Sequence, residues 1–215
     1  WVVAADEYSS YAGAVYLYDG DTSAPTAASD TRSGTASYDF CGVSIAAGTD
    51  VTDDGTLDWI VGCSGLAGGR VYIEDGSSGE QITSASGSDS FGYALATDDV
   101  NGDGVGDILA TRIGTYEAFL YLGPVVTGTY NGIDDDSYSG SVGFGYDAAA
   151  PGDLDSDGYG DLVVSGGTTG NAFYFMGDSA GTALSRGSMS VGRYAQDATA
   201  GDFDGDGTLD LAIGD

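Results

Sequence analysis

The chain has 215 residues, which is enough to bury a sizeable core as one domain or two small ones. Its 34 acidic side chains are opposed by 5 Arg, with no Lys and no His, so the formal net charge is -29. This charge repels nucleic acid and anionic membrane surfaces, and no apolar run approaches the roughly 20 residues that span a bilayer. Neither nucleic-acid binding nor membrane insertion is therefore expected.

Short strands separated by Gly-rich turns are predicted along the whole chain, and no amphipathic segment is longer than a turn or two. The first strand is AVYLYDG from Ala14, an alternating aromatic segment closed by Gly. An aromatic segment from Phe40 to Gly42 follows, then an Asp-rich nonapeptide from Asp50 and the apolar strand WIVG from Trp59. The Ser- and Thr-rich stretches 21–37 and 77–90 are expected to be long surface loops.

The same succession of segments then recurs along the rest of the chain. Alternating aromatic strands begin at Arg70, Ala118 and Ala172, aromatic–small pairs are Phe91-Gly92, Phe144-Gly145 and Tyr194-Ala195, and apolar strands begin at Ile108, Leu162 and Leu211. Because side chains alternate between the two faces of a strand, each aromatic strand is predicted to have one buried and one exposed face.

Four Asp-rich nonapeptides give this repeat its regularity. DVTDDGTLD, DVNGDGVGD, DLDSDGYGD and DFDGDGTLD begin at Asp50, Asp99, Asp153 and Asp202, in steps of 49, 54 and 49 residues. We call them the first to fourth Asp loops. Each runs directly into one of the apolar strands, so each is predicted to be the turn of a β-hairpin.

The repeat predicts the fold class. A unit of about 50 residues with three clear strands and a weaker fourth is typical of a propeller blade. We therefore expect an all-β, β-propeller-like array of four-stranded antiparallel blades. The expected units are a partial blade over 1–37, full blades over 38–90, 91–142 and 143–190, and a partial blade over 191–215. Because the strand after an Asp loop occurs at both ends, an excerpt from a longer array is expected, as part of either a closed propeller or an open stacked array.

The Asp loops have the composition of calcium sites. Ca²⁺ takes six to eight oxygen ligands, and carboxylates at alternating positions of a tight loop converge on one point while Gly permits the turn. The expected ligands are the side chains at the first, third, fifth and ninth positions and the backbone carbonyl at the seventh. The four predicted Ca²⁺ sites are Asp50, Thr52, Asp54, Thr56 and Asp58; Asp99, Asn101, Asp103, Val105 and Asp107; Asp153, Asp155, Asp157, Tyr159 and Asp161; and Asp202, Asp204, Asp206, Thr208 and Asp210.

The loops are also compared with two other motifs that the same residues could form, an EF-hand and an ordinary turn. An EF-hand needs a bidentate Glu at the twelfth loop position. The residues there are Val61, Ala110, Val164 and Ile213, which excludes that motif. A single loop of this kind is also compatible with an ordinary turn, but four in phase with strands favour metal binding. The third and fourth loops have four carboxylates each and the first two have three, so tighter binding is expected at the third and fourth.

Cys41 and Cys63 are the only cysteines, and they flank the first Asp loop. A disulfide is favoured, and two small buried thiols remain the alternative.

The segments SFGYALATDDVNGDGVGDILAT and GFGYDAAAPGDLDSDGYGDLVVSGG resemble the FG-GAP repeats of integrin α-subunit propellers and of their bacterial secreted relatives. The resemblance covers nearly the whole chain, although the Gly-Ala-Pro part is degenerate, for example as Gly62-Cys63-Ser64. It implies an extracellular, calcium-stabilised β-propeller, secreted or on the cell surface, that works in adhesion or assembly and not in catalysis.

The expected function is a noncatalytic extracellular module that binds a protein or carbohydrate ligand or builds a surface structure. The alternatives are a subunit of a self-assembling extracellular filament and an accessory domain of a secreted hydrolase. Without His or Lys, the commonest general base and Schiff-base chemistry are missing, which disfavours an enzyme. Tyr16, Tyr18, Tyr72, Tyr121 and Tyr174 are candidates for a recognition surface, with core packing as the favoured alternative.

Overall fold

The computed structural model describes residues 2–18, 27–65, 68–74, 79–83, 90–125, 129–131, 136–140, 142–168, 170–182, 184–192 and 197–214. These residues form antiparallel sheets and one helical turn, α1 (Tyr8–Tyr11), so the predicted all-β class is confirmed. The pair Tyr194-Ala195 and the two terminal residues lie outside the described residues. No helix in the described part of the chain is long and apolar enough to cross a membrane.

The strands of the described residues form five sheets, numbered here in chain order. The first contains β1 (Val2–Ala5), β2 (Ala14–Leu17) and β3 (Asp30–Ser33), and the second contains β4 (Cys41–Ala47), β5 (Trp59–Cys63), β6 (Arg70–Glu74) and β7 (Gly79–Thr83). The third contains β8 (Phe91–Asp98), β9 (Asp107–Arg112), β10 (Glu117–Tyr121) and β12 (Asp136–Ser139), and the fourth contains β13 (Ala148–Gly152), β14 (Asp161–Ser165), β15 (Asn171–Met176) and β16 (Ser185–Ser190). The fifth is the hairpin of β17 (Asp197–Gly201) and β18 (Asp210–Gly214).

Within each sheet, strands that follow one another in the chain pair antiparallel. One short strand departs from this rule. β11 (Thr129–Asn131) lies in the range expected for the third sheet, but it pairs parallel with β7 of the second sheet.

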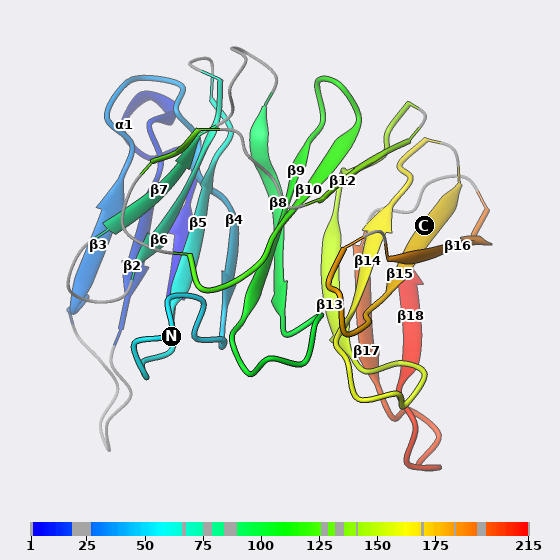
Figure 1. Ribbon diagram of the computed structural model, residues 1–215. Coiled ribbons are helices and arrows are strands. Elements are labelled where there is room, and N and C mark those ends of the chain that lie inside the picture. The colour runs from blue at the N-terminus through cyan, green and yellow to red at the C-terminus, as the bar shows by residue number, and fades with distance from the viewer. Residues whose placement is uncertain are drawn as a thin grey trace.

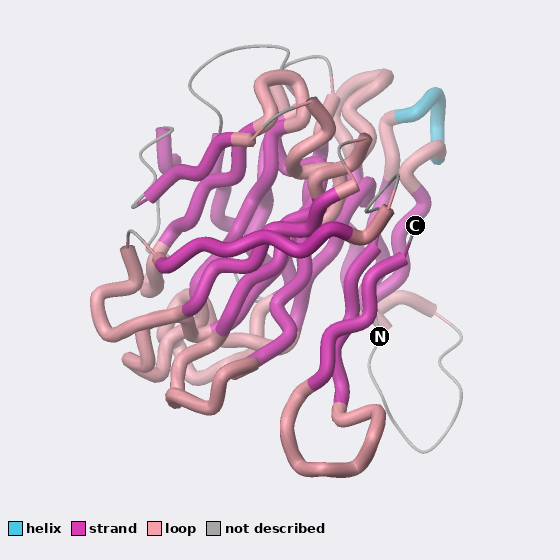
Figure 2. Tube along the Cα trace, turned by 90° about the vertical axis from the view of Figure 1, so that its right-hand side faces the viewer, coloured by secondary structure: helices cyan, strands magenta, loops and turns pink. Residues whose placement is uncertain are grey.

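The sheets stand side by side in chain order, as Figure 1 shows, with the first and fifth sheets at opposite sides. Their leading strands touch in succession, since β1 contacts β4, β4 contacts β8, β8 contacts β13 and β13 contacts β17. Figure 2 views the molecule from the side of the fifth sheet, with its hairpin toward the viewer. Successive sheets are therefore joined by direct contact of their first strands.

Apolar clusters fill the space between neighbouring sheets. In β9 the adjacent residues Ile108 and Leu109 are both fully buried, but they belong to different clusters. Ile108 packs with Ile60 and Val71 of the second sheet, and Leu109 packs with Leu162 of the fourth. A sheet covered on both faces needs apolar residues at consecutive positions, which explains the short apolar runs after the Asp loops.

Two sequence predictions differ from the structure. The expected exposed face of the strand from Arg70 is wrong for β6, where Val71 to Glu74 are all buried, because the first sheet covers the face that includes Tyr72. Arg32 of β3 lies over the Tyr72 ring, 4.6 Å from its centroid, and pairs with Glu74. The stretches expected to be surface loops contain β3 and β7. Backbone pairing holds these strands, β3 with β2 and β7 with β6, so they need no apolar alternation.

Candidate metal centres

Each Asp loop connects the two antiparallel strands of a hairpin. All four loops lie along one edge of the molecule, the lower edge in Figure 1. In the second, third and fourth loops the ninth residue begins the second strand, and in the first loop Asp58 directly precedes it. In three hairpins it pairs directly with the residue that precedes the loop, as Asp98 with Asp107, Gly152 with Asp161 and Gly201 with Asp210. The strand register therefore brings the two ends of each loop together.

The first Asp of each loop organises the turn around its carboxylate. In the third loop, Oδ1 of Asp153 accepts the N–H of Asp157 at 3.0 Å and Oδ2 accepts the N–H of Gly158 at 2.8 Å. The same bonds to the fifth and sixth residues recur at Asp50, Asp99 and Asp202. The sixth residue is Gly with a positive φ of 88 to 97° in all four loops, a conformation that L side chains rarely adopt.

The ninth Asp closes the loop onto its second residue. Oδ2 accepts the second residue's N–H from Val51 at 2.7 Å, Val100 at 2.8 Å, Leu154 at 2.7 Å and Phe203 at 2.9 Å. In the second and third loops, Oδ1 also accepts an amide N–H, from Gly123 and Gly177, each at 2.8 Å. In the first loop, Oδ1 of Asp58 is buried and has no hydrogen-bond partner among the residues that the structure describes. That oxygen is an orphaned acceptor at the end of an acidic loop.

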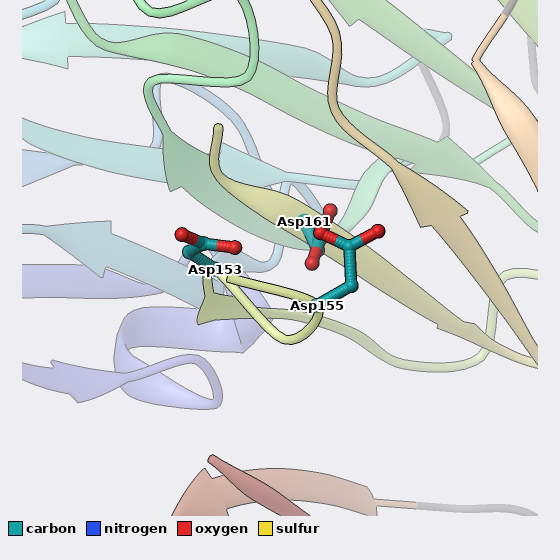
Figure 3. A group of neighbouring side chains, drawn as sticks. All are labelled: Asp153, Asp155 and Asp161. Carbon is teal, nitrogen blue, oxygen red and sulfur yellow. The ribbon is translucent and has the colours of Figure 1, made fainter. Parts of the chain in front are cut away.

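Three carboxylates converge in each of the last two loops. Asp153, Asp155 and Asp161 each offer an oxygen atom, and these atoms lie within 4.8 Å of one another (Figure 3). Asp202, Asp204 and Asp210 form the same cluster in the fourth loop. The loop fold thus brings together the carboxylates of residues one, three and nine in these two loops.

Other predicted ligands are placed differently. The fifth-position Asp157 and Asp206 lie outside those clusters and instead accept the N–H of the seventh residue, at 3.1 Å from Tyr159 and 2.8 Å from Thr208. Asp54 and Asp103 make the same bond to Thr56 and Val105.

In the first two loops the third position is not a carboxylate. Thr52 Oγ1 donates to Asp58 at 3.3 Å, and Asn101 Nδ2 donates to Asp103 at 3.0 Å. No cluster of three carboxylates forms there among the described residues. The seventh-position carbonyls remain predicted ligands.

The ninth-position carboxylate is buried in the first three loops. Asp58, Asp107 and Asp161 are 2 %, 1 % and 0 % exposed. Burial raises the pKa of all three, and that of Asp107 rises to about 7, with Asp103 and Asp99 adding repulsion. Burial also acts on Asp50, but hydrogen bonds from the loop backbone outweigh it and lower the pKa of that carboxyl.

Both ion pairs in the described part of the chain use Glu, so they leave the loop carboxylates without an Arg partner. An all-oxygen donor set of this kind suits a hard divalent cation such as Ca²⁺ better than zinc or iron.

Comparison with known proteins identifies the repeat. Residues 153–213, which contain the third and fourth Asp loops, match the family model of the FG-GAP-like repeat. This segment is an FG-GAP-like repeat. Over 228 residues the chain is 28% identical to integrin alpha-5 of Xenopus laevis, an alignment that covers 86% of this chain and 21% of the integrin, so the chain spans about a fifth of that relative's length. The crystal structure of the V. cholerae biofilm matrix protein Bap1 aligns with a TM-score of 0.45 and 20% identity, over 79% of this chain and 27% of that chain.

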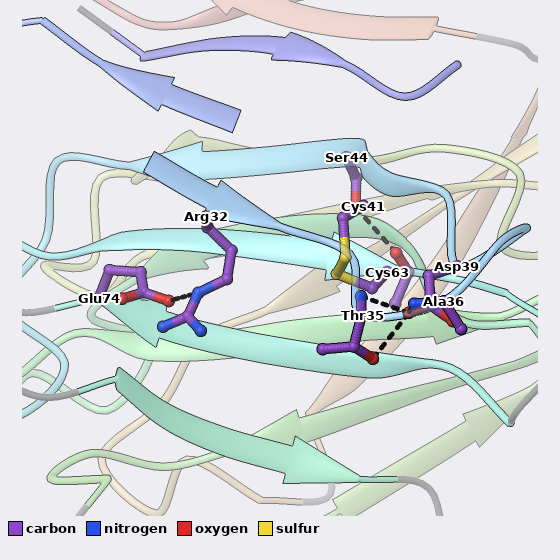
Figure 4. The surroundings of a disulfide bond; sticks show 9 residues. Arg32, Thr35, Ala36, Asp39, Cys41, Ser44, Cys63 and Glu74 are labelled. Carbon is purple, nitrogen blue, oxygen red and sulfur yellow. Dashed lines mark hydrogen bonds and ion pairs between the residues drawn. A yellow bond between two sulfur atoms is a disulfide. The ribbon is translucent and has the colours of Figure 1, made fainter. Parts of the chain in front are cut away.

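A disulfide joins the two strands that flank the first Asp loop. Cys41 of β4 and Cys63 of β5 are register partners with their Cα atoms 3.9 Å apart, and both are buried (Figure 4). Next to them Asp39 accepts hydrogen bonds from the backbone N–H groups of Thr35 and Ala36, at 2.8 and 2.9 Å. The covalent link therefore closes the hairpin at the end opposite the loop.

The leading strands of the second, third and fourth sheets also line a cavity of about 370 Å³ between β4, β8 and the start of β13. Tyr93 and Tyr146 meet edge to face with ring centroids 5.8 Å apart, and Ser44 and Asp147 add polar atoms to the wall. Burial, together with Tyr146, raises the pKa of Tyr93. Sequence reasoning did not single out this pair, because the two tyrosines come from different repeats.

Two of the five tyrosines considered as a recognition surface are packed inside the sheets, and Tyr16, Tyr18 and Tyr174 are half-buried. Tyr121 is 1 % exposed and Tyr72 is 9 % exposed, which favours the core-packing alternative for these two. The residues that sequence reasoning missed are Gly106, Gly123, Gly160 and Gly177, whose backbone N–H groups reach an Asp loop of the same or the preceding hairpin. Their signal in the sequence is a Gly at the eighth loop position or 16 residues after the ninth-position Asp.

Proposed function

We propose that the chain is a noncatalytic, extracellular, calcium-binding module with a β-propeller-like arrangement of its repeats, working in adhesion or surface structure. The observation that carries the calcium part is the convergence of three carboxylates within 4.8 Å in the third and the fourth Asp loops. Carboxylates this close repel one another unless a cation lies among them. The orphaned Oδ1 of Asp58 supports a ligand in the first loop as well.

The ion is proposed to be held by the same positions in every loop. These are the side chains of residues one, three, five and nine, with the seventh backbone carbonyl as a fifth ligand. Ca²⁺ supplies positive charge at the turn of each hairpin, and its binding free energy then adds to the stability of the folded hairpin. Four ions add eight positive charges and bring the net charge from -29 to about -21.

Calorimetric titration of the metal-free chain tests the calcium proposal. We expect four bound Ca²⁺ per chain and little response to Mg²⁺, because Mg²⁺ demands a tighter octahedral shell. Asp155→Asn and Asp204→Asn should each weaken or remove one site. The proposal would be contradicted if excess calcium produced neither a heat of binding nor a change in the stability of the chain.

An extracellular adhesion or surface role is supported by three features. The chain resembles integrin alpha-5 over most of its length, its two cysteines are bonded, and its surface is strongly acidic. Disulfides persist mainly in oxidising compartments, which agrees with secretion.

The cavity beside Tyr93 and Tyr146 is the proposed place for a protein or carbohydrate ligand. Binding of the calcium-loaded chain to glycan and matrix-protein panels should weaken in Tyr146→Ala. The control is Tyr8→Ala, which alters an exposed ring in α1 and should leave binding unchanged. Equal binding by both variants would remove the cavity from the proposal.

A second candidate, self-assembly into a filament, is favoured by the second position of the Asp loops. Val51 and Val100 are fully buried, whereas Phe203 is 62 % exposed. Docking of a second copy on the fifth sheet would bury Phe203, and such a head-to-tail contact propagates. Electron microscopy and sedimentation of the chain and of Phe203→Ser test this candidate. Filaments that Phe203→Ser abolishes would support it, and a monomer at all concentrations would exclude it.

A further inference from the structure

The first three Asp loops are connected to one another by backbone hydrogen bonds between hairpins. Gly106, the eighth residue of the second loop, donates its N–H to the carbonyl oxygen of Asp50, the first residue of the first loop, at 2.7 Å. Gly160 donates in the same way to the carbonyl oxygen of Asp99 at 2.8 Å. Each bond joins a residue next to one proposed ion site to a ligand residue of the preceding site.

A second connection runs parallel to the first. Gly123 donates to the carboxylate of Asp107, and two residues later Val125 donates to the carbonyl of Val51 at 2.7 Å. The segment after β10 therefore links the ninth residue of the second loop to the second residue of the first. Gly177 and Asp178 repeat the arrangement, donating to Asp161 at 2.8 Å and to the carbonyl of Val100 at 3.0 Å.

The eighth-position glycines are required by these contacts. A Cβ atom on Gly106 would lie 2.5 Å from Cβ of Thr49, and one on Gly160 would lie 2.5 Å from Cγ of Asp98. Both distances are shorter than carbon atoms tolerate, so any larger residue would push the hairpins apart.

The fourth loop is attached differently. Its eighth residue is Leu209, and among the described residues no hydrogen bond joins it to the carbonyl of Asp153. A Cβ added to Gly152 would lie 3.2 Å from Cδ1 of Leu209, so this junction brings a large side chain against a small residue instead.

We propose that the eighth-position glycines Gly106 and Gly160 are positioning residues that couple calcium binding between neighbouring loops, so that the first three sites bind cooperatively and the fourth binds independently. This inference rests on the proposed calcium function. The peptide unit from Val105 to Gly106 has the predicted ligand carbonyl at one end and the N–H that holds Asp50 at the other. When an ion orders the second loop, it therefore also orders the backbone of the first loop. Thermodynamic linkage then requires that an ion in the first loop strengthen calcium binding at the second loop by the same factor.

Each loop contains its own reporter for a test. The sixth-position glycines Gly55, Gly104, Gly158 and Gly207 donate to the first Asp of their loops at 2.8, 2.9, 2.8 and 3.0 Å. Nuclear magnetic resonance of the chain labelled with ¹⁵N-glycine follows these four amides separately during a calcium titration in about 0.15 M salt, which screens exposed charges beyond roughly 8 Å.

Asp103→Asn removes one carboxylate from the second loop and keeps an acceptor for the Val105 N–H. We expect the calcium affinities reported by Gly55 and Gly158 to fall by about fivefold or more. The affinity reported by Gly207 should be unchanged. Asp206→Asn in the fourth loop removes the same charge and should leave Gly158 unchanged. Gly106→Ala should reduce the coupling between the first two loops, while Leu209→Gly should not affect it.

Unchanged affinities at Gly55 and Gly158 in Asp103→Asn would overturn the coupling while leaving calcium binding intact. An equal effect of Asp206→Asn on Gly158 would also overturn it, because charge alone would then explain both results. If none of the four glycine amides responds to calcium in the unaltered chain, both the coupling and the proposed function fail.

Discussion

The amide N–H of Gly177 donates to Oδ1 of Asp161 at 2.8 Å, which ties the end of β15 to the last residue of the third Asp loop. Oδ2 of the same carboxylate holds the N–H of Leu154 inside the loop. Asp161 is fully buried, so both of these hydrogen bonds are shielded from water. The ninth-position carboxylate is therefore a structural element of the hairpin even before an ion is considered.

Asp161→Ala should destabilise the metal-free chain by about 2 kcal/mol, because it leaves buried N–H donors without an acceptor. Asp155→Ala is the matched control, since Asp155 is exposed and belongs to the same carboxylate cluster. Asp155→Ala should lower the free energy of unfolding by less than about 0.5 kcal/mol when a chelator keeps the chain metal-free. Urea unfolding in chelator measures both values, and equal losses would show that the ninth position has no special structural role.

Asn101→Asp should change stability in opposite directions with and without calcium. The substitution gives the second loop a fourth carboxylate, which should raise its calcium affinity on the order of tenfold. It also replaces the hydrogen bond from Asn101 to Asp103 with repulsion, so the metal-free chain should melt at a lower temperature. Thermal melts in chelator and in calcium test this, and a shift of the same sign in both would contradict it.

Loss of the disulfide should cost about 3 kcal/mol, because the bond restrains the unfolded chain across a separation of 22 residues. The variant is the double substitution Cys41→Ser and Cys63→Ser, measured by urea unfolding in saturating calcium. A reductant should lower the stability of the unaltered chain by a similar amount and leave the variant unaffected. A reductant effect on the variant would point to a cause other than this bond.

The metal-free chain should become less stable as the pH rises from about 4 to about 7. Asp107 has an ordinary pKa of 3.8 and a folded pKa of about 7, so the folded state retains a proton that the unfolded state has already lost. Above the unfolded pKa this difference opposes folding, and the cost grows until the folded carboxyl ionises. The melting temperature measured in chelator at several pH values should fall less steeply with pH for Asp107→Asn than for the unaltered chain. Equal slopes for the two proteins would contradict the shifted pKa, since overall charge repulsion acts on both.

The hairpins and their loops were predictable because both signals are local. The apolar run after Asp107 must be a buried strand, and the Gly at position 104 marks the turn before it. The same local pattern predicted that Asp153, Asp155 and Asp161 would converge.

The contacts between hairpins were not predictable in the same way. The partner of Asp107 is an amide 16 residues later, and that of Asp50 is an amide in another repeat. Backbone N–H groups are present at every residue except Pro, so a Gly at the eighth loop position marks a donor but not the acceptor that it reaches in another repeat. The strand β3 was missed for a related reason, because its residues DTRS have no apolar alternation and only pairing with β2 makes them a strand.

The most direct test of the account is a crystal structure of the chain grown in millimolar calcium. We expect an ion in each Asp loop, with oxygen ligands at about 2.3–2.6 Å that include Asp153, Asp155 and Asp161 in the third loop. Loops that hold only water at that calcium concentration would contradict the central claim that these carboxylates form calcium sites.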